Sequence, residues 1–322
     1  MLNFVRLRYL WFAISLLVIV PGLIFLLMPG GGLRVGIDFA GGNLWEFVIP
    51  NPTRPVTSDE VRRLFEQAGI EASPPQVARP DEQGRVIVTV RTPEVQTQDP
   101  RKQQVVNALT QAYPGATLSR FESVGETVSR ESTRQAIFAV LLASLAILGY
   151  LTFAFRKAPH PFRYGACAII AMLHDVILVL GVAAMLGYFI GLEVDALFLT
   201  ALLTVISFSV HDTIVVFDRI RENLKLRRSS ESFEEIVNLS IVQTLTRSIN
   251  TQLTTLLTLL ALLLFGGETI RHFVLILTIG LLSGTYSSIF NAAQLLVVWE
   301  NGWTEDWRRI WRRAQPPTQV TA

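Results

Sequence analysis

Cysteine is nearly absent from this chain of 322 residues, in which Cys167 is the only one. One thiol cannot form an intramolecular disulfide, and it cannot supply a cysteine-based metal site. No Gly-x-x-x-x-Gly-Lys-Ser/Thr sequence occurs either, so the phosphate-binding loop of many ATPases is missing. These absences exclude ATP as a direct energy source, and we expect no cofactor, no metal centre and no enzymatic activity.

Long apolar runs, by contrast, are abundant, and half of the residues are hydrophobic. Six runs approach the ~20 residues that a membrane-spanning helix needs. They are residues 10–28, 136–155, 164–191, 196–217, 249–265 and 273–299. The first run is followed by no small-x-small cleavage site, so we interpret it as an uncleaved anchor. The sequence therefore predicts an α-helical polytopic membrane protein with six transmembrane helices.

Positive charge marks one side of the membrane. Lys and Arg gather near residues 6–8, 156–163, 219–228 and 308–313, whereas 187–195 has none and 266–272 has only Arg271. The positive-inside rule then places both termini in the cytoplasm. Because the net charge is only +2 and the arginines lie at membrane boundaries, we expect no nucleic-acid partner.

This topology divides the chain into four parts. The predicted parts are the N-terminus and first helix (1–30), an extracytoplasmic domain (31–133), a five-helix membrane domain (134–299) and a cytoplasmic tail (300–322). A cytoplasmic loop of about 218–242 interrupts the membrane domain. Its segment Ser230–Ile241 has the pattern of an amphipathic helix, which we expect near the membrane surface. None of the cytoplasmic segments is long enough to house a nucleotide-binding domain.

The polar stretch 31–133 has the pattern of a small α+β domain. Alternating apolar residues predict strands, and Thr57 or Ser58 is a suitable helix cap. The expected strands are 44–49, 71–78, 85–91 and 116–121, and the expected helices 58–69 and 100–113. The resulting β-α-β-β-α-β order is the ferredoxin-like arrangement. That scaffold serves many roles, so it indicates docking or substrate handling without naming an activity.

Asp212 is the main functional candidate, because a charged side chain inside the membrane is costly and usually functional. Arg247, on the next helix, lies at the same expected depth, about 9 Å from the cytoplasmic end at 1.5 Å per residue. The pair is either a fixed ion pair that locks two helices or a proton relay. In the relay, water access or a change in the Arg247 distance switches the protonation state of Asp212.

Other polar groups lie in the same runs. A stripe of hydroxyls and an amide is compatible with either a water path or interhelical hydrogen bonds. It comprises Ser207, Ser209, Thr213, Asn250, Thr251, Thr254, Thr255 and Thr258. His174, Asp175 and His211 are either packing residues or participants in proton transfer, and their spacing is not that of a metal site. Gly280 and Gly284 form a small-residue face suited to helix packing.

Several motifs occur in a specific order. They are Gly36–Gly42 (GIDFAGG), Val210–Asn223 (VHDTIVVFDRIREN), Thr246–Thr251 (TRSINT), Gly266–Glu268 (GGE) and Gly284–Phe290 (GTYSSIF). With these motifs the chain resembles the SecF family, the smaller membrane subunits of SecD-SecF protein-export complexes. That family is related to the resistance-nodulation-division transporters. The chain departs from the family pattern at His211, where asparagine is usual, and at Ser207–Ser209.

The resemblance implies a function as an accessory subunit of the Sec translocase in the cytoplasmic (inner) membrane. Its implied partners are SecD, which supplies six further helices, the SecYEG translocon, YajC, unfolded preproteins and protons. It assigns proton passage to Asp212 and Arg247, and His211 would add a titratable group beside them. Two other interpretations remain open: a proton-coupled transporter of small molecules or lipids, and a non-transporting translocon scaffold.

Overall fold

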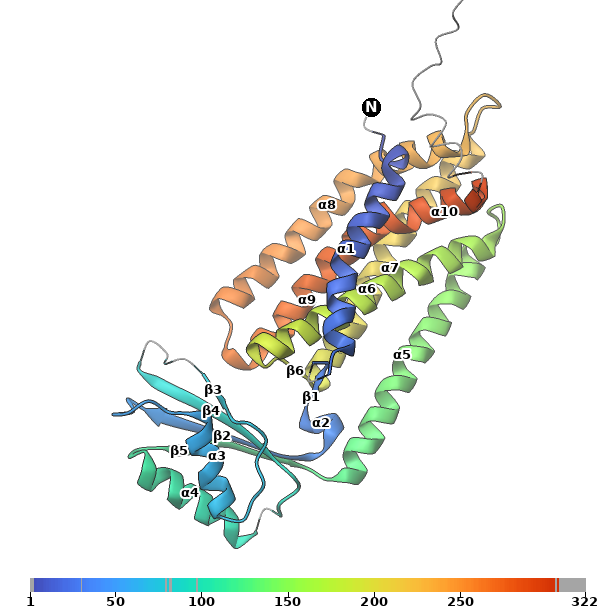
Figure 1. Ribbon diagram of the computed structural model, residues 1–322. Coiled ribbons are helices and arrows are strands. Elements are labelled where there is room, and N and C mark those ends of the chain that lie inside the picture. Colours follow the sequence, from blue (N-terminus) through green and yellow to red (C-terminus); the bar gives the residue numbers. More distant parts are fainter. Residues whose placement is uncertain are drawn as a thin grey trace, which may run out of the picture. The chain divides into compact units, whose positions relative to one another are not determined.

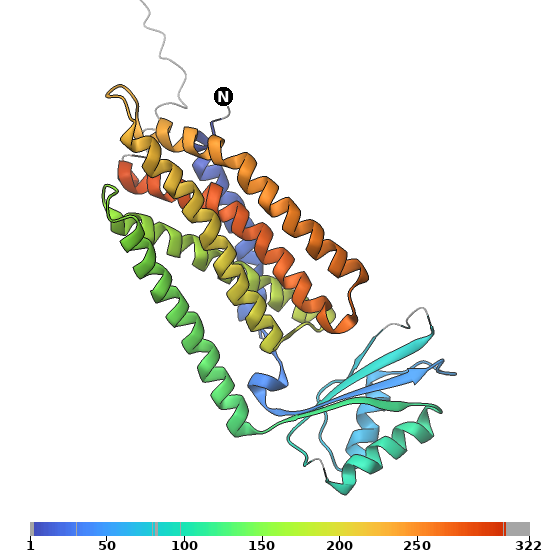
Figure 2. The ribbon, with the colours of Figure 1, turned by 180° about the vertical axis from the view of Figure 1, so that it is seen from behind.

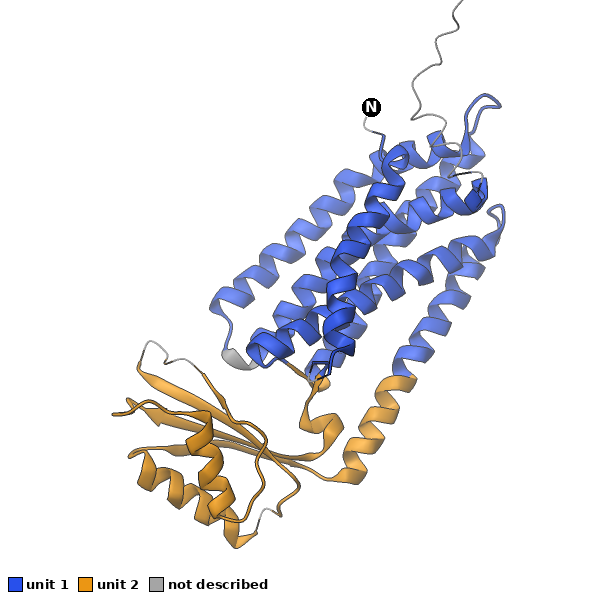
Figure 3. Cartoon of the chain, in the orientation of Figure 1, with its two compact units in different colours: residues 1–33, 139–192, 197–322 blue, residues 34–138, 193–196 orange. Residues whose placement is uncertain are grey.

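The computed structural model describes residues 3–29, 31–78, 80, 83–96, 98–304 and 306. It divides into two compact units (Figure 3). The membrane unit consists of residues 1–33, 139–192 and 197–322, and the ferredoxin-like unit of residues 34–138 and 193–196. Each unit is described by itself below.

The membrane unit is a bundle of long helices (Figures 1 and 2). They are η1 (Val5–Leu7), α1 (Arg8–Leu27), α5 (Glu126–Ala154), α6 (Pro161–Ile190), α7 (Ala196–Lys225), α8 (Phe233–Phe265), α9 (Glu268–Ser287), the π-helical η2 (Ser288–Ala292) and α10 (Ala293–Asn301). In the described part of the chain, six helical segments are long and apolar enough to cross a membrane, with η1–α1 and α9–α10 each counting as one. The predicted six-helix polytopic fold is confirmed.

The prediction of a separate amphipathic helix at Ser230–Ile241 is wrong. Instead α7 continues to Lys225, α8 begins at Phe233, and only a short turn separates them. No glycine or proline interrupts the charged end of α7, so its hydrogen-bond ladder continues past the apolar stretch. Ser232 then starts α8 with a capping box that includes Glu235. The apolar side chains Val237 and Ile241 are fully buried in the bundle instead of facing a membrane surface.

Glycines set the closest helix contacts. Gly22 of α1 and Gly181 of α6 face each other, and a Cβ built on either would lie 2.8 Å from the Cα of the other. On α9, a Cβ on Gly280 would collide with the Val205 side chain, and one on Gly284 would lie 3.2 Å from Ser209 of α7. The packing role predicted for Gly280 and Gly284 is confirmed.

Gly181→Ala is expected to destabilise the bundle even though alanine favours helix by about 1 kcal/mol over glycine. The added methyl group meets the Gly22 backbone, which cannot move aside as a flexible side chain would. Gly149→Ala of α5 is the matched control, because a Cβ there meets nothing within 4 Å. In thermal unfolding of the purified variants, the melting temperature should fall for Gly181→Ala. It should rise or stay unchanged for Gly149→Ala. An equal melting temperature for both variants would contradict the close crossing.

The first and last helices of the bundle are joined by a buried charge network. Arg8, 1 % exposed, donates through Nε to Asp306 Oδ2 at 2.8 Å and through its terminal nitrogen to Oδ1. The same guanidinium reaches Glu234 of α8 at 3.2 Å. The hydroxyl of Tyr9 and the amide of Asn301 also donate to Asp306, at 3.0 and 2.7 Å. Three distant segments of the chain, those of Arg8, Glu234 and Asp306, therefore meet around one guanidinium.

The ferredoxin-like unit has the predicted β-α-β-β-α-β order. Its elements are β2 (Gly42–Pro50), α3 (Ser58–Gln67), β3 (Gln76–Val77), β4 (Arg85–Thr92), α4 (Pro100–Ala112) and β5 (Thr117–Val124). The sheet order β3-β4-β2-β5, with antiparallel neighbours throughout, is that of the ferredoxin-like fold. Thr57 caps α3 by accepting from Glu60 N at 3.4 Å.

One strand is much shorter than predicted. Residues 71–78 were expected to form it, but only Gln76 and Val77 pair with β4. The reason is the Pro74–Pro75 pair, because proline has no backbone N–H to donate to a ladder. The segment still follows the sheet edge, where Ser73 N and Ala78 N bond to β4 carbonyls at 2.9 Å.

The core of this unit lies between the sheet and its two helices. Alternate residues of β2 and β4 are buried, as the predicted period of two requires. The core side chains are Trp45, Phe47, Ile49, Val86, Val88 and Val90 from the sheet, with Val61, Phe65, Val105 and Leu109 from the helices. The buried Trp45 indole donates to Thr92 Oγ1 at 3.0 Å, so its polar atom is satisfied.

A short parallel pair lies beside this fold. β1 (Arg34–Val35) pairs with β6 (Glu193–Val194), and α2 (Ile37–Ala40) follows directly. Asp38 of α2 accepts a hydrogen bond from Ala196 N, the first residue of α7, at 2.9 Å. The GIDFAGG motif therefore supplies a cap for the helix that carries Asp212.

Candidate functional site

Asp212 is buried in α7, with 4 % of its surface exposed. Its Oδ2 accepts a hydrogen bond of 2.6 Å from Nε2 of Gln252 on α8. The amide therefore bridges the two helices at the carboxylate. Sequence reasoning missed Gln252, although its position in the apolar run of α8 was a signal, since an amide is also costly in a membrane.

Arg247 does not form an ion pair with Asp212 in the described structure. It is exposed on α8, although it lies close enough for its charge to act on the carboxylate. The five residues from Arg247 to Gln252 turn about 140° around a helix axis. The equal depth expected from the sequence therefore did not predict contact, because Gln252 and not Arg247 points at Asp212.

The hydroxyl stripe divides into two sets. On α8, Asn250, Thr251, Thr254 and Thr258 are exposed, and the Thr254 and Thr258 hydroxyls donate to carbonyls of their own helix at 2.8 and 3.2 Å. Thr255, half-buried, does the same. This set forms a polar face that the described residues of the chain leave uncovered.

The second set lies inside the bundle. Ser209 of α7 donates to Asp175 Oδ2 at 2.6 Å, and Thr213 donates to Ser209 O and to Ser288 Oγ at 2.9 and 3.1 Å. Ser207 is exposed and does not join them. The buried hydroxyls thus belong to α7 and η2 and lie beside Asp175 of α6, whereas the exposed threonines belong to α8.

The histidines occupy different environments. His211 is 62 % exposed, and its Nδ1 lies 3.9 Å from Asp212 Oδ1. His174 is only 11 % exposed, and its Nδ1 lies 3.0 Å from Oδ1 of the buried Asp175. The two acid–imidazole pairs are therefore separate: the first opens to the surface of α7 and the second lies within the bundle.

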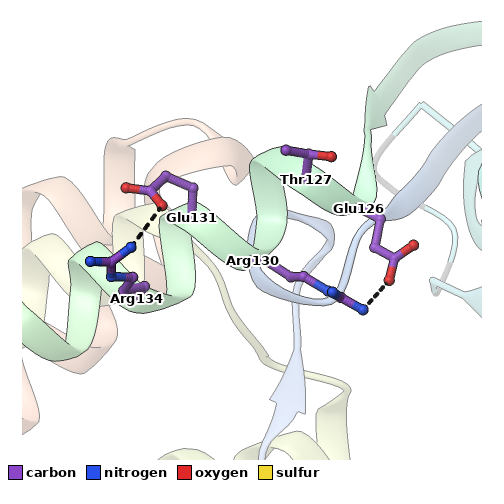
Figure 4. A pocket seen from close by; sticks show the side chains of 5 residues that line it. All are labelled: Glu126, Thr127, Arg130, Glu131 and Arg134. Carbon is purple, nitrogen blue, oxygen red and sulfur yellow. Dashed lines mark hydrogen bonds and ion pairs between the residues drawn. The ribbon is translucent and has the colours of Figure 1, made fainter.

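The described residues contain no group of His, Cys, Asp and Glu that could hold a metal ion. A hollow of about 510 Å³ lies along the first turns of α5 (Figure 4). Its charges pair with one another, Arg130 with Glu126 at 2.5 Å and Arg134 with Glu131 at 3.9 Å. A single exposed helix with mutually compensated charges offers no enclosed site for chemistry.

Fold and site together define a class: a multi-pass membrane protein with a ferredoxin-like unit and a carboxylate held inside its helical bundle. The family of protein export membrane proteins SecD/SecF, through its C-terminal part, matches residues 104–302. Protein translocase subunit SecF of Thermobaculum terrenum is 53 % identical over the whole of both chains. The same subunit of Anaerolinea thermophila is 48 % identical over 94 % of this chain and 95 % of the relative. The chain belongs to the SecD/SecF family.

Solved structures give the same result. The crystal structure of SecDF, a translocon-associated membrane protein from Thermus thermophilus, superposes with a TM-score of 0.79 and 34 % identity. It covers 93 % of this chain, which spans only 39 % of the SecDF chain. SecDF in its super-membrane-facing form gives a TM-score of 0.65 at 33 % identity, covering 96 % of this chain and 40 % of that one. The relatives are named as translocase subunits, and the SecDF chains join a SecF-like part to further sequence.

Proposed function

We propose that this chain is a proton-motive-force-dependent accessory subunit of the Sec translocase. It acts with SecD to help complete the export of unfolded preproteins across the cytoplasmic membrane. The observation that carries the proposal is Asp212, a buried carboxylate on a membrane-spanning helix that is held by an amide and not by an ion pair. Such a group can gain and lose a proton without breaking a salt bridge.

Gln252 suits both protonation states of Asp212. Its Nε2 donates to the ionised carboxylate at 2.6 Å. Its Oε1 is buried and has no hydrogen-bond partner among the described residues. A protonated Asp212 can donate its hydroxyl to that oxygen after the amide rotates. Proton uptake at Asp212 therefore changes the contact between α7 and α8.

The uncovered face of α8 supports SecD as the partner. A positive charge and an amide, at Arg247 and Asn250, are exposed on a helix apolar enough to span the membrane. Polar side chains facing lipid are costly, and in membrane proteins they face other helices or water. We propose that SecD helices cover this face, and the Thermus SecDF relative carries such a partner in the same chain.

The proposed orientation follows the distribution of Lys and Arg. Both termini lie in the cytoplasm, and residues 31–133 lie outside, where they handle the emerging preprotein. SecYEG is the proposed docking partner of the complex, and YajC a further subunit. The clusters at 156–163 and 219–228 support this orientation, since positive residues remain on the cytoplasmic side.

Export from vesicles tests the proposal. Inverted membrane vesicles with and without this chain and SecD are loaded with a preprotein arrested midway, and completion of export is followed with and without a protonophore. We expect the complex to speed completion, and the protonophore to remove that gain. A gain that survives the protonophore would exclude a proton-driven role. Loss of the translocon complex without this chain would indicate the scaffold role instead.

His211→Asn is expected to change the pH profile of export. The imidazole lies 3.9 Å from the Asp212 carboxylate and is open to water, and histidine is the side chain that ordinarily titrates near neutral pH. Export rates measured in vesicles across pH should therefore lose one inflection in the variant, with the maximal rate retained. Superimposable profiles for the two proteins would show that His211 takes no part.

A further inference from the structure

Asp175 lies in the middle of α6 and has no exposed surface. Three serine hydroxyls donate to its carboxylate at 2.6 Å: Ser209 and Ser287 to Oδ2, and Ser283 to Oδ1. The fourth contact is His174 Nδ1, which lies 3.0 Å from Oδ1. Each carboxylate oxygen thus has two partners, contributed by α6, α7 and α9.

This arrangement determines where hydrogens lie. With three hydroxyls and one ring nitrogen directed at two oxygens, the ionised acid accepts four hydrogen bonds and leaves no oxygen unsatisfied. When Asp175 is ionised, His174 Nδ1 carries the hydrogen and donates it to Oδ1. The carboxylate fixes both the tautomer and the orientation of the imidazole, as second partners do for catalytic histidines.

The other ring nitrogen is free. Nε2 of His174 is buried and has no hydrogen-bond partner among the described residues. The ring lies over Tyr286 of α9, with centroids 6.5 Å apart and an interplanar angle of 25°. The Tyr286 hydroxyl is engaged elsewhere, because it donates to Trp11 O at 2.6 Å. An oriented imidazole with one unoccupied nitrogen is a proton acceptor.

No positive side chain compensates Asp175 among the interactions of the described residues. Arg163, at the start of α6, pairs with Glu300 of α10, and Arg8 of α1 pairs with Asp306. The ionisable groups of α7 in this region are His211 and Asp212, and that of α9 is Tyr286. An unpaired negative charge inside a membrane bundle is costly, and one proton on His174 removes it.

We propose that His174 and Asp175 form a second proton-binding centre of the membrane bundle, in which Asp175 orients the imidazole through Nδ1 and the buried Nε2 binds the exchangeable proton. The centre changes from a net charge of −1 to zero when it takes up one proton, and it returns to −1 on release. This inference deepens the proposed proton-driven function and rests on it only for the direction of proton movement.

Hydroxyl groups connect the centre with α7. Ser209, which bonds Asp175, precedes Asp212 by three residues, and residues three apart lie on neighbouring positions of one helix face. The Ser209 carbonyl in turn accepts from Thr213 and Ser288 at 2.9 and 3.1 Å. Ser288 begins the π-helical η2, a local helix geometry frequent at functional sites. A change of charge at the centre is therefore felt by the helix that carries Asp212.

Nitrogen NMR of histidine tests the proposal directly. The full chain with SecD is reconstituted in bilayers with ¹⁵N-labelled histidine, and the spectra are recorded from about pH 5 to pH 9, where imidazoles titrate. The chain has four histidines, of which the exposed His160 and His272 serve as references. His174→Asn and His211→Asn then assign the two remaining signals. We expect Nδ1 of His174 to stay protonated while Nε2 titrates. A His174 signal that does not change over this range would overturn the proposal.

Two variants separate this inference from the proposed function. Asp212→Asn should leave the His174 titration in place, whereas Asp175→Asn should remove the single tautomer. Loss of the His174 titration in Asp212→Asn would mean that only one site exists. His174→Asn retains an amide in place of Nδ1 but has no Nε2, and it should slow proton-driven export at least about tenfold. Unchanged proton-driven export in this variant, with normal copurification of SecD, would also overturn the inference.

Discussion

Replacing Asp212 with asparagine is expected to abolish proton-driven export while the chain still assembles with SecD. Asparagine has the same shape, and its oxygen can accept the hydrogen bond that Gln252 donates at 2.6 Å. It cannot bind and release a proton, so the contact between α7 and α8 no longer changes with the gradient. Completion of export in vesicles should fall to the rate seen without the complex.

The matched control is Asp218→Asn on the same helix. Asp218 is about half exposed and pairs with Arg221 at 2.5 Å, and exposed pairs contribute at most about 1 kcal/mol. Export should be close to that of the unaltered chain. Arg247→Met should resemble Asp212→Asn, since it removes the charge that acts on the carboxylate. Normal proton-dependent export by Asp212→Asn would reduce Asp212 to a structural residue.

The second large effect is expected for Asp306→Ala. Both members of the Arg8–Asp306 pair are buried, with 1 % and 0 % of their surface exposed. Removing one partner leaves an uncompensated buried charge, which costs about 3–5 kcal/mol. Thermal unfolding of the purified protein should show a large fall in melting temperature. The exposed pair of Arg163 and Glu300 provides the control, and Glu300→Ala should shift the melting temperature little.

The double variant Arg8→Leu with Asp306→Leu separates charge from packing. Replacing both members of a buried pair by apolar side chains is often nearly neutral. We therefore expect the double variant to recover most of the stability that Asp306→Ala loses. A double variant as unstable as Asp306→Ala would show that the other contacts of Arg8, with Val5 O at 2.7 Å and Glu234 at 3.2 Å, carry the effect.

The same pair gives a pH dependence. Burial by itself raises the pKa of Asp306, but the hydrogen bonds from Arg8 and Asn301 and the charge of Arg8 outweigh it, so the pKa lies below its ordinary value. A lowered folded-state pKa stabilises the fold above the unfolded value of about 3.9, and the stabilisation disappears as pH falls through the folded-state pKa. The difference in melting temperature between unaltered chain and Asp306→Ala should therefore shrink in acid, and a constant difference would contradict this.

Most of the architecture was predictable from the sequence because its signals are local. An apolar run of about twenty residues is itself the requirement for crossing a membrane, so six runs gave six spans. Alternation in β2 and β4 gave the strands of the ferredoxin-like unit, and only the Pro74–Pro75 pair shortened one of them. The predicted end of α7 and start of α8 were wrong. The charged residues after 217 were interpreted as a loop, although a helix continues until it is interrupted or capped.

The candidate site was predictable only in part. The sequence by itself determined that Asp212 is a carboxylate in a membrane span and that Asp175 lies beside His174, and it predicted a depth for Asp212 equal to that of Arg247. Only the tertiary structure decided that Gln252 holds Asp212, that serines of α7 and α9 surround Asp175, and that Arg8 meets Asp306. The physical reason is that hydropathy gives the depth of a residue along its helix, whereas its partners depend on the rotation of each helix about its axis. That rotation is set by side-chain packing between helices, such as Gly22 against Gly181, which no single run contains.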